Sequence, residues 1–134
     1  MTTYALDTNI ISHLLKENPV VKSNIRDALT ARNELIIPPL VYYEVRRGLF
    51  SKETPVQTAS FDRFCQRIPV GEHSKEALDV AARIYATLRG KGNLIEDADI
   101  LIAAFCMDGG YTLVSDNTRH FDRVEGLRLV NWVE

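Results

Sequence analysis

Four acidic side chains adjoin runs of apolar residues, where charged groups are uncommon. They are Asp7, Glu44, Asp99 and Asp116. Carboxylates are hard oxygen ligands, and a group of them selects Mg²⁺ or Mn²⁺. The reaction that uses such a group is phosphodiester hydrolysis, in which the metal polarises the phosphate, helps to deprotonate a water and stabilises the leaving oxygen. We therefore take these four residues as candidate catalytic residues.

Each of the four acids also has a purely structural interpretation. Asp7 is suited to cap the N-terminus of a helix, and Glu44 could lie on a solvated helix face beside Arg47. Asp99 would sit in the first turn of a helix, where an acid favours the helix dipole. Asp116 could belong to a turn. Taken singly these signals are weak, and only together do they predict a metal site.

The elements that must position these acids follow from the hydrophobic pattern. The expected strands cover residues 3–6, 34–37, 111–114 and 129–131, with a short edge strand at 68–70. The expected helices begin near residues 10, 18, 40, 54, 76 and 98. Strands that alternate with helices imply a parallel sheet covered on both faces. The predicted fold class is therefore α/β, a three-layer α/β/α domain with a central, mostly parallel sheet of four to five strands.

Two of these helices have apolar faces that we expect to be buried. In the helix at 76–88 they are Leu78, Ala81, Ala82 and Tyr85. In the helix after Pro19 they are Val20, Val21, Ile25 and Leu29.

The carboxyl ends of parallel strands form the usual ligand-binding edge of an open α/β sheet. Asp7 directly follows the strand 3–6, and Asp116 comes two residues after the strand 111–114. The pattern therefore places two carboxylates, far apart in the sequence, on one edge of the sheet. Carboxylates crowded there repel one another, and a bound cation would relieve the repulsion.

The chain of 134 residues has the size of one domain, and we expect a single domain over 1–134. A net charge of −2 argues against a general nucleic-acid coat protein, although acidic catalytic residues can mask a local basic surface. No apolar stretch is long enough to span a bilayer, and the N-terminus does not resemble a signal peptide. We therefore expect a cytoplasmic protein with no membrane partner.

Histidines and basic residues provide further candidates. His13, His73 and His120 lack the spacing of metal ligands, so we expect surface or capping roles for them. Seven basic residues have a solvated surface as their simplest interpretation, and a phosphate-binding rim around the acidic centre as the functional one. They are Arg46, Arg47, Lys52, Arg63, Arg67, Arg89 and Lys91. Arg63 and Arg67 would share a helix face because they are four residues apart.

Four segments carry a more specific signal. They are residues 4–9, 39–48, 97–104 and 113–121, the last followed by 126–127 and 130–132. In this order they resemble PIN-domain ribonucleases, and most closely the VapC-type toxins of type II bacterial toxin–antitoxin pairs. The resemblance covers essentially the whole chain, and the family's acids fall on Asp7, Glu44 and Asp99. The family's fourth polar position falls on Asn117, but we carry the acidic role to Asp116 because it is the only carboxylate there.

This resemblance implies an endoribonuclease that holds Mg²⁺, or Mn²⁺, mainly through Asp7 and Asp99. Glu44 would orient water or a second metal, and Asp116 or Asn117 would complete the outer shell. The resemblance also implies a toxin that forms a homodimer, cleaves structured RNA such as tRNA or rRNA, and is silenced by a VapB-type antitoxin. We expect the antitoxin to dock on apolar residues of the N-terminal helices and of the helix that carries Glu44, although most of these could be ordinary core residues. They are Ile11, Leu14, Leu15, Val21, Val41 and Val45.

Two other functions stay open at this point. A phosphatase or phosphate-accepting receiver domain also places an aspartate at a strand end. The dehalogenase-like phosphatases, however, need a second aspartate two residues later, where this chain has Asn9. A non-catalytic RNA-binding or scaffold protein of the same fold is the other alternative, and the retention of Asp7, Glu44 and Asp99 argues against it.

Overall fold

A four-stranded parallel sheet forms the centre of the protein, whose computed structural model describes all residues from 1 to 134. The strands are β1 (Thr3–Leu6), β2 (Glu34–Ile36), β3 (Thr112–Val114) and β4 (Leu129–Val130). Their order across the sheet is β2-β1-β3-β4, and every neighbouring pair is parallel. The α/β fold with a mostly parallel sheet is therefore confirmed.

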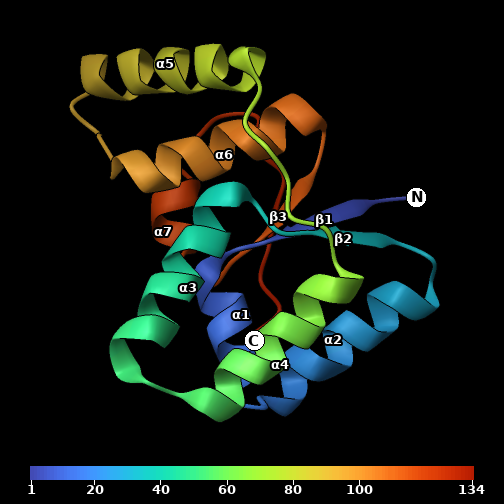
Figure 1. Cartoon of the computed structure of the whole chain (residues 1–134). Coiled ribbons are helices and arrows are strands. Elements are labelled where there is room, and N and C mark those ends of the chain that lie inside the picture. The colour runs from blue at the N-terminus through green and yellow to red at the C-terminus, as the bar shows by residue number, and fades with distance from the viewer.

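Seven helices surround this sheet. They are α1 (Thr8–Leu15), α2 (Pro19–Thr30), α3 (Pro39–Lys52), α4 (Pro55–Arg67), α5 (Lys75–Gly90), α6 (Asp97–Gly109) and α7 (Thr118–Phe121). In the view of Figure 1, α5 and α6 lie above the sheet, and α1, α2 and α4 lie below it. This arrangement gives the three layers expected from the alternating pattern. None of the helices has the length and apolar character that crossing a membrane requires.

The expected edge strand at 68–70 is reduced to an isolated bridge between Ile37 and Val70. The carbonyl of Pro69 accepts a hydrogen bond from the backbone N of Ile37 at 2.9 Å, and Gly71 N donates to the Ile37 carbonyl at 2.8 Å. Because Pro69 has no N–H of its own to donate, the pairing does not extend into a ladder.

The buried faces of two helices differ from the expectation. The buried residues of α5 are Ala77, Ala81, Ile84 and Leu88. Of the residues expected there only Ala81 is buried, while Leu78 and Tyr85 are exposed. In α2, Val20 and Leu29 are likewise exposed. Each helix has two adjoining apolar stripes, and in α5 the extensive contact with α6 determines which stripe is buried.

A hydrophobic core of 27 buried residues lies between the sheet and the helices. It includes Ile11, Val21, Val41 and Val45, so the prediction that these residues form a docking surface is wrong. They are buried because α1 contacts α2, α3 and α4 and has little free apolar surface. Leu14 and Leu15 are only partly buried at the edge of this core.

Candidate active site

Asp7 is only 5% exposed and joins the end of β1 to the start of α1. Its Oδ1 accepts a hydrogen bond from the backbone N of Thr8 at 2.8 Å, and its Oδ2 accepts one from Ser115 Oγ at 2.7 Å. Burial raises the pKa of Asp7 to about 6, these two hydrogen bonds oppose the rise, and the charges of Asp99 and Glu44 add to it. Asp7 therefore caps α1 and also carries a negative charge that a cation would stabilise.

Asp99 lies in the first turn of α6, with 19% of its side chain exposed. Burial is the largest cause that raises the pKa of this carboxyl, and the charges of Glu96 and Glu44 act in the same direction. His120, on α7, lowers that pKa because its Nδ1 lies 3.4 Å from Asp99 Oδ2. Asp99 therefore belongs to the same group of interacting acids as Asp7.

Glu44 reaches this group from α3. Its Oε1 accepts a hydrogen bond from Thr8 Oγ1 at 2.8 Å, and its Oε2 lies 3.7 Å from the Arg47 guanidinium. Thr8 thus contacts Asp7 through its backbone and Glu44 through its hydroxyl. The pairing of Glu44 with Arg47 is present as well, as the structural interpretation expects, and a catalytic role for Glu44 stays a prediction.

Asp116 and Asn117 make separate contacts after β3. The Oδ2 of Asp116 lies 3.3 Å from His13 Nε2, on α1. Asn117 Nδ2 lies 3.1 Å from His120 Nδ1, and Asn117 N donates to Ser115 Oγ at 2.9 Å. Because Ser115 contacts Asp7 and His120 contacts Asp99, Asn117 is linked to these two aspartates, whereas Asp116 is linked to α1. The role of Asp116 as a fourth catalytic acid stays a prediction.

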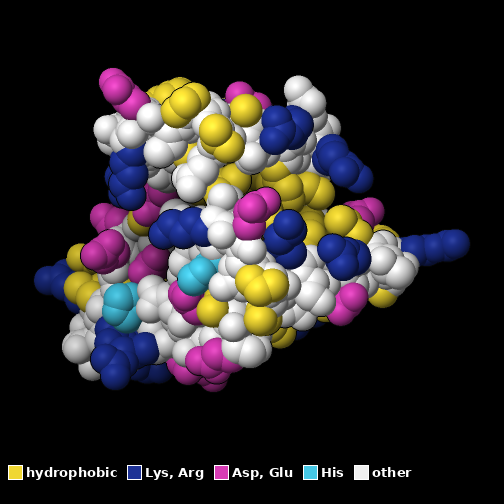
Figure 2. Space-filling view, turned by 90° about the horizontal axis from the view of Figure 1, so that it is seen from below, with side chains coloured by type: hydrophobic (Ala, Val, Ile, Leu, Met, Phe, Trp, Pro, Cys, Tyr) yellow, Lys and Arg dark blue, Asp and Glu magenta, His cyan; other side chains and the backbone are white.

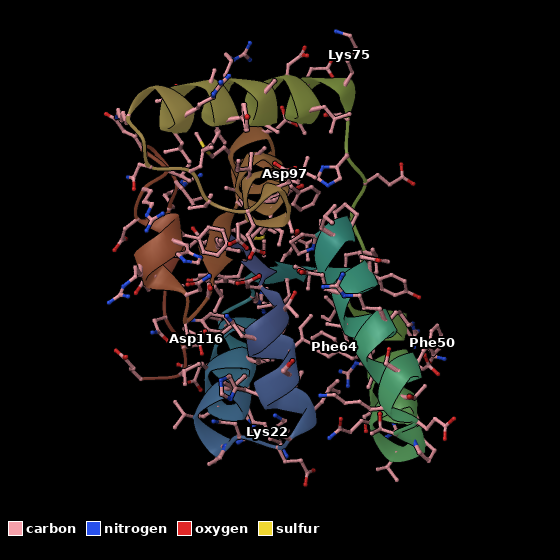
Figure 3. All side chains as sticks on the ribbon, turned by 90° about the vertical axis from the view of Figure 1, so that its left-hand side faces the viewer. Lys22, Phe50, Phe64, Lys75, Asp97 and Asp116 are labelled. Atoms are coloured by element: carbon pink, nitrogen blue, oxygen red, sulfur yellow. The ribbon has the colours of Figure 1, made fainter.

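These acids come from four separate segments that the parallel sheet brings to one edge. In Figure 3, Asp116 lies between α7 and α1, and Asp97 marks the start of α6. Figure 2 shows acidic side chains and histidines gathered on one face, with Lys and Arg side chains around them. The edge is the one expected from the strand ends, and Glu44 and Asp99 are brought to it by α3 and α6.

Comparisons with known proteins agree with this geometry. The family model for the PIN domain matches residues 4–127. The chain belongs to the PIN-domain family. Ribonuclease VapC2 of Haemophilus influenzae is 31% identical, and the match covers 99% of this chain and all of that protein. The tRNA(fMet)-specific endonuclease VapC of Shigella flexneri is 28% identical over 98% of this chain and 99% of its own.

Solved structures give the same assignment. The crystal structure of VapBC2 from Rickettsia felis, bound to a DNA fragment from its promoter, contains a chain that matches with a TM-score of 0.89 at 27% identity. That match covers 98% of this chain and 99% of the other. This PIN domain is therefore of the VapC ribonuclease type, as its motifs indicate.

Two histidines and one serine lie beside the candidate acids without having been assigned to the site from the sequence. His13 and His120 are partly exposed, as expected for surface residues, and they also contact Asp116 and Asp99. The short helix α7 brings His120 next to Asp99 of α6. A helix of only four residues has no hydrophobic periodicity by which the sequence could reveal it. Ser115 could have been inferred from the two strands expected to pair in parallel. Leu6 of β1 lies opposite Val114 of β3, so Ser115, the residue after β3, lies opposite Asp7.

The donors of this PIN domain fit a hard divalent cation in type, since the three interacting acids offer only oxygen atoms. No group of three or more His, Cys, Asp or Glu side chains is close enough together in this structure to bind one ion jointly. The pKa of Asp7 is raised chiefly by burial and further by the charges of Asp99 and Glu44, and a bound cation would favour the ionised form of this carboxyl against both effects.

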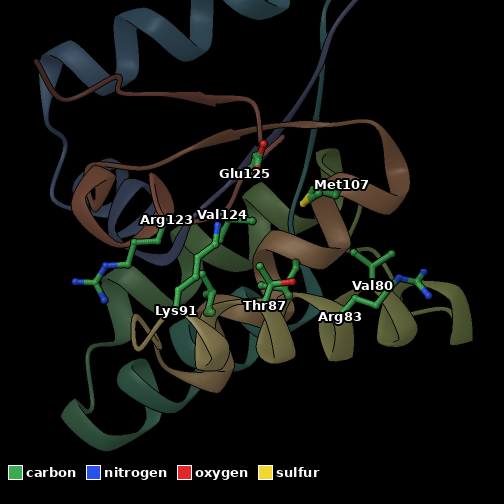
Figure 4. A pocket seen from close by; sticks show the side chains of 10 residues that line it. Val80, Arg83, Thr87, Lys91, Met107, Arg123, Val124 and Glu125 are labelled. Carbon is green, nitrogen blue, oxygen red and sulfur yellow. The ribbon is translucent and has the colours of Figure 1, made fainter.

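Several basic residues have contacts away from the active-site acids. Arg46 pairs with Asp62 at 2.5 Å and lies over the ring of Phe61, so it holds α3 against α4. A groove of about 410 Å³ between α5, α6 and the turn after α7 contains other cations, among them Arg83 and Arg123, but none of the active-site acids (Figure 4). A cavity of about 110 Å³ between α1 and α3 is lined by residues that include Thr8, Glu44 and Lys52.

Proposed function

We propose that this chain is a divalent-metal-dependent endoribonuclease, with Mg²⁺ as the preferred ion and Mn²⁺ as a substitute. The observation that carries the proposal is the convergence of Asp7, Glu44 and Asp99, from three separate elements, on the carboxyl edge of the sheet. Burying acids next to one another raises their pKa values and is unfavourable for stability alone. Such an arrangement is typical of a site built to bind cations and phosphate.

Asp7 and Asp99 would hold the metal, and Glu44 would orient a water or a second ion. When bound, the cation polarises the scissile phosphate and lowers the pKa of a water. Ser115 and Thr8 hold the two oxygens of Asp7 in place, and His120 positions Asp99 from the other side. Asn117, and Asp116 in a more distant position, would complete the outer shell of the site.

The phosphatase alternative is weaker. The position where a dehalogenase-like phosphatase has its second aspartate is occupied by Asn9, whose Oδ1 lies 3.5 Å from the backbone N of Asp116. Asn9 therefore connects α1 to the segment that follows β3. A non-catalytic scaffold is also disfavoured, because it would gain nothing from keeping three repelling carboxylates together.

The biological setting that we propose is a toxin–antitoxin pair. The similar chains are named ribonucleases and a tRNA(fMet)-specific endonuclease, and the similar solved structure is a VapBC complex. By analogy, this chain would cleave structured RNA such as tRNA or rRNA, form a homodimer and be inhibited by a VapB-type antitoxin.

The test is brief expression of the wild-type chain and of Asp7→Asn, followed by mapping of new RNA 5′ ends in the cell. We expect discrete new ends in tRNA or rRNA and slower growth with the wild type alone. Co-expression of the adjacent small open reading frame should restore growth and yield a co-purifying complex. The absence of new ends would refute the ribonuclease, while new ends without growth inhibition or a partner would refute only the toxin.

A further inference from the structure

Three large side chains lie on one outward face of α3, next to the active site. Tyr43 is 56% exposed and Phe50 is 70% exposed, and Arg47 lies between them with 58% of its side chain exposed. Spacings of three and four residues place the three on the same side of the helix. Figure 3 shows Phe50 pointing away from the body of the protein. We call Tyr43, Arg47 and Phe50 the α3 aromatic face.

This face is continuous with the active site through Arg47. The guanidinium lies 3.7 Å from Glu44 Oε2 on one side and 5.2 Å from the centre of the Tyr43 ring on the other. Arg47 is about 60° from Glu44 around the helix axis, and Tyr43 is about 100° from it. A strand that places a phosphate near Glu44 and continues along this side of α3 would pass Arg47 and then the Tyr43 ring.

We propose that the α3 aromatic face binds unpaired nucleotides of the RNA substrate that flank the scissile phosphate, an inference that rests on the proposed ribonuclease function. Tyr43 and Phe50 would stack on bases, and Arg47 would contact a phosphate or stack on a base by its planar guanidinium. Aromatic rings bind any base through its face, and an arginine between them supplies the charge that the backbone needs. Paired bases are already stacked in a helix, so the face selects loops and bulges over duplex.

A protein partner is the competing occupant, because tyrosine, phenylalanine and arginine are also common at protein interfaces. Two observations favour RNA. Arg47 interrupts the apolar surface between the rings, so the face lacks a continuous apolar centre. Its cation is also directly beside Glu44, where a negatively charged substrate has to be held against the repulsion of that carboxylate.

The test measures stacking and binding without cleavage. RNA hairpins carrying 2-aminopurine at successive loop positions are titrated with the full chain in EDTA, since the emission of this base falls when it stacks. We compare wild type, Tyr43→Leu, Tyr43→Trp and the control Tyr85→Leu, which removes an exposed tyrosine from α5. Tyr43→Leu should lose the quenching and bind about 5- to 100-fold more weakly, whereas Tyr43→Trp should restore both. Tyr85→Leu should match the wild type.

Equal binding and quenching by Tyr43→Leu and Tyr85→Leu would overturn the inference. So would a change of oligomeric mass in Tyr43→Leu with unaltered RNA binding, because it would identify a protein interface. Parallel cleavage assays in Mg²⁺ separate this inference from the proposed function. Cleavage by the wild type with the same kcat/KM in Tyr43→Leu refutes the aromatic face alone, and Tyr43-dependent binding without any cleavage refutes the nuclease alone.

Discussion

Replacing Asp7 by asparagine should stabilise the metal-free protein at neutral pH. In the folded state the pKa of Asp7 is raised to about 6, chiefly by burial, whereas in an unfolded chain an aspartate titrates near 4. The folded protein therefore holds this proton more tightly, and it loses stability as pH rises from about 4 through 6. The full loss, reached above pH 6, is about 3 kcal/mol.

The asparagine variant escapes this loss but gives up one contact. Its side-chain oxygen can still accept from Thr8 N, while its amide cannot accept the hydrogen bond that Ser115 Oγ donates to the second carboxylate oxygen. That lost bond costs about 1 kcal/mol. Asp7→Asn should thus be about 2 kcal/mol more stable than wild type at pH 7.5 and about 1 kcal/mol less stable at pH 4.

Urea unfolding in EDTA, followed by the fluorescence of Trp132, measures this difference between pH 4 and pH 8. The matched control is Asp27→Asn, which removes an exposed acid on α2 and should follow the wild-type curve. A variant that is less stable than wild type at pH 7.5, or a difference that does not change with pH, would refute the assignment of a buried, repelled carboxylate. Adding Mg²⁺ should stabilise the wild type and leave Asp7→Asn unchanged.

Three further predictions concern activity. Asp99→Asn should lower RNA cleavage by about 100-fold or more in Mg²⁺ while the far-ultraviolet circular dichroism stays native, and full activity would remove Asp99 from the site. Asn117→Ala should reduce cleavage by about 10-fold or more, and by more than Asp116→Asn does, because only Asn117 is linked to His120. The reverse order in single-turnover assays would assign the fourth position to Asp116. Replacing Arg63 and Arg67 together by alanine should lower the salt dependence of RNA binding by roughly two charges if they contact phosphates, and an unchanged slope would leave them as solvated surface.

The sheet and its active edge could be predicted because short apolar segments end at polar residues. The segment 3–6 is followed by Asp7, and the segment 111–114 is followed by Ser115, so the ends of the two strands indicated where the candidate site lies. Glu44 and Asp99 lie on helices, where periodicity alone does not show which acid faces the sheet edge. Their assignment came from the family resemblance, and the raised pKa values of Asp7 and Asp99 are consistent with it.

Features that depend on tertiary contacts could not be predicted. The buried stripe of α5 is selected by contact with α6, so Ile84 is buried and Tyr85 is exposed although both are apolar enough for a core. His120 reaches Asp99 only because the chain turns back through α7. Similarly, His13 meets Asp116 across two elements whose distance in space the sequence does not show.

The most direct test of the central claim, that Asp7 and Asp99 hold a catalytic divalent metal, is a metal titration of RNA cleavage. The purified chain and its Asp7→Asn, Asp99→Asn and Asp27→Asn variants are assayed on tRNA with increasing Mg²⁺ or Mn²⁺ and in EDTA. We predict saturable, metal-dependent cleavage by wild type and Asp27→Asn, none in EDTA, and none by the other two variants at any metal concentration tested. Cleavage in EDTA, or wild-type metal dependence in Asp7→Asn or Asp99→Asn, would contradict the account.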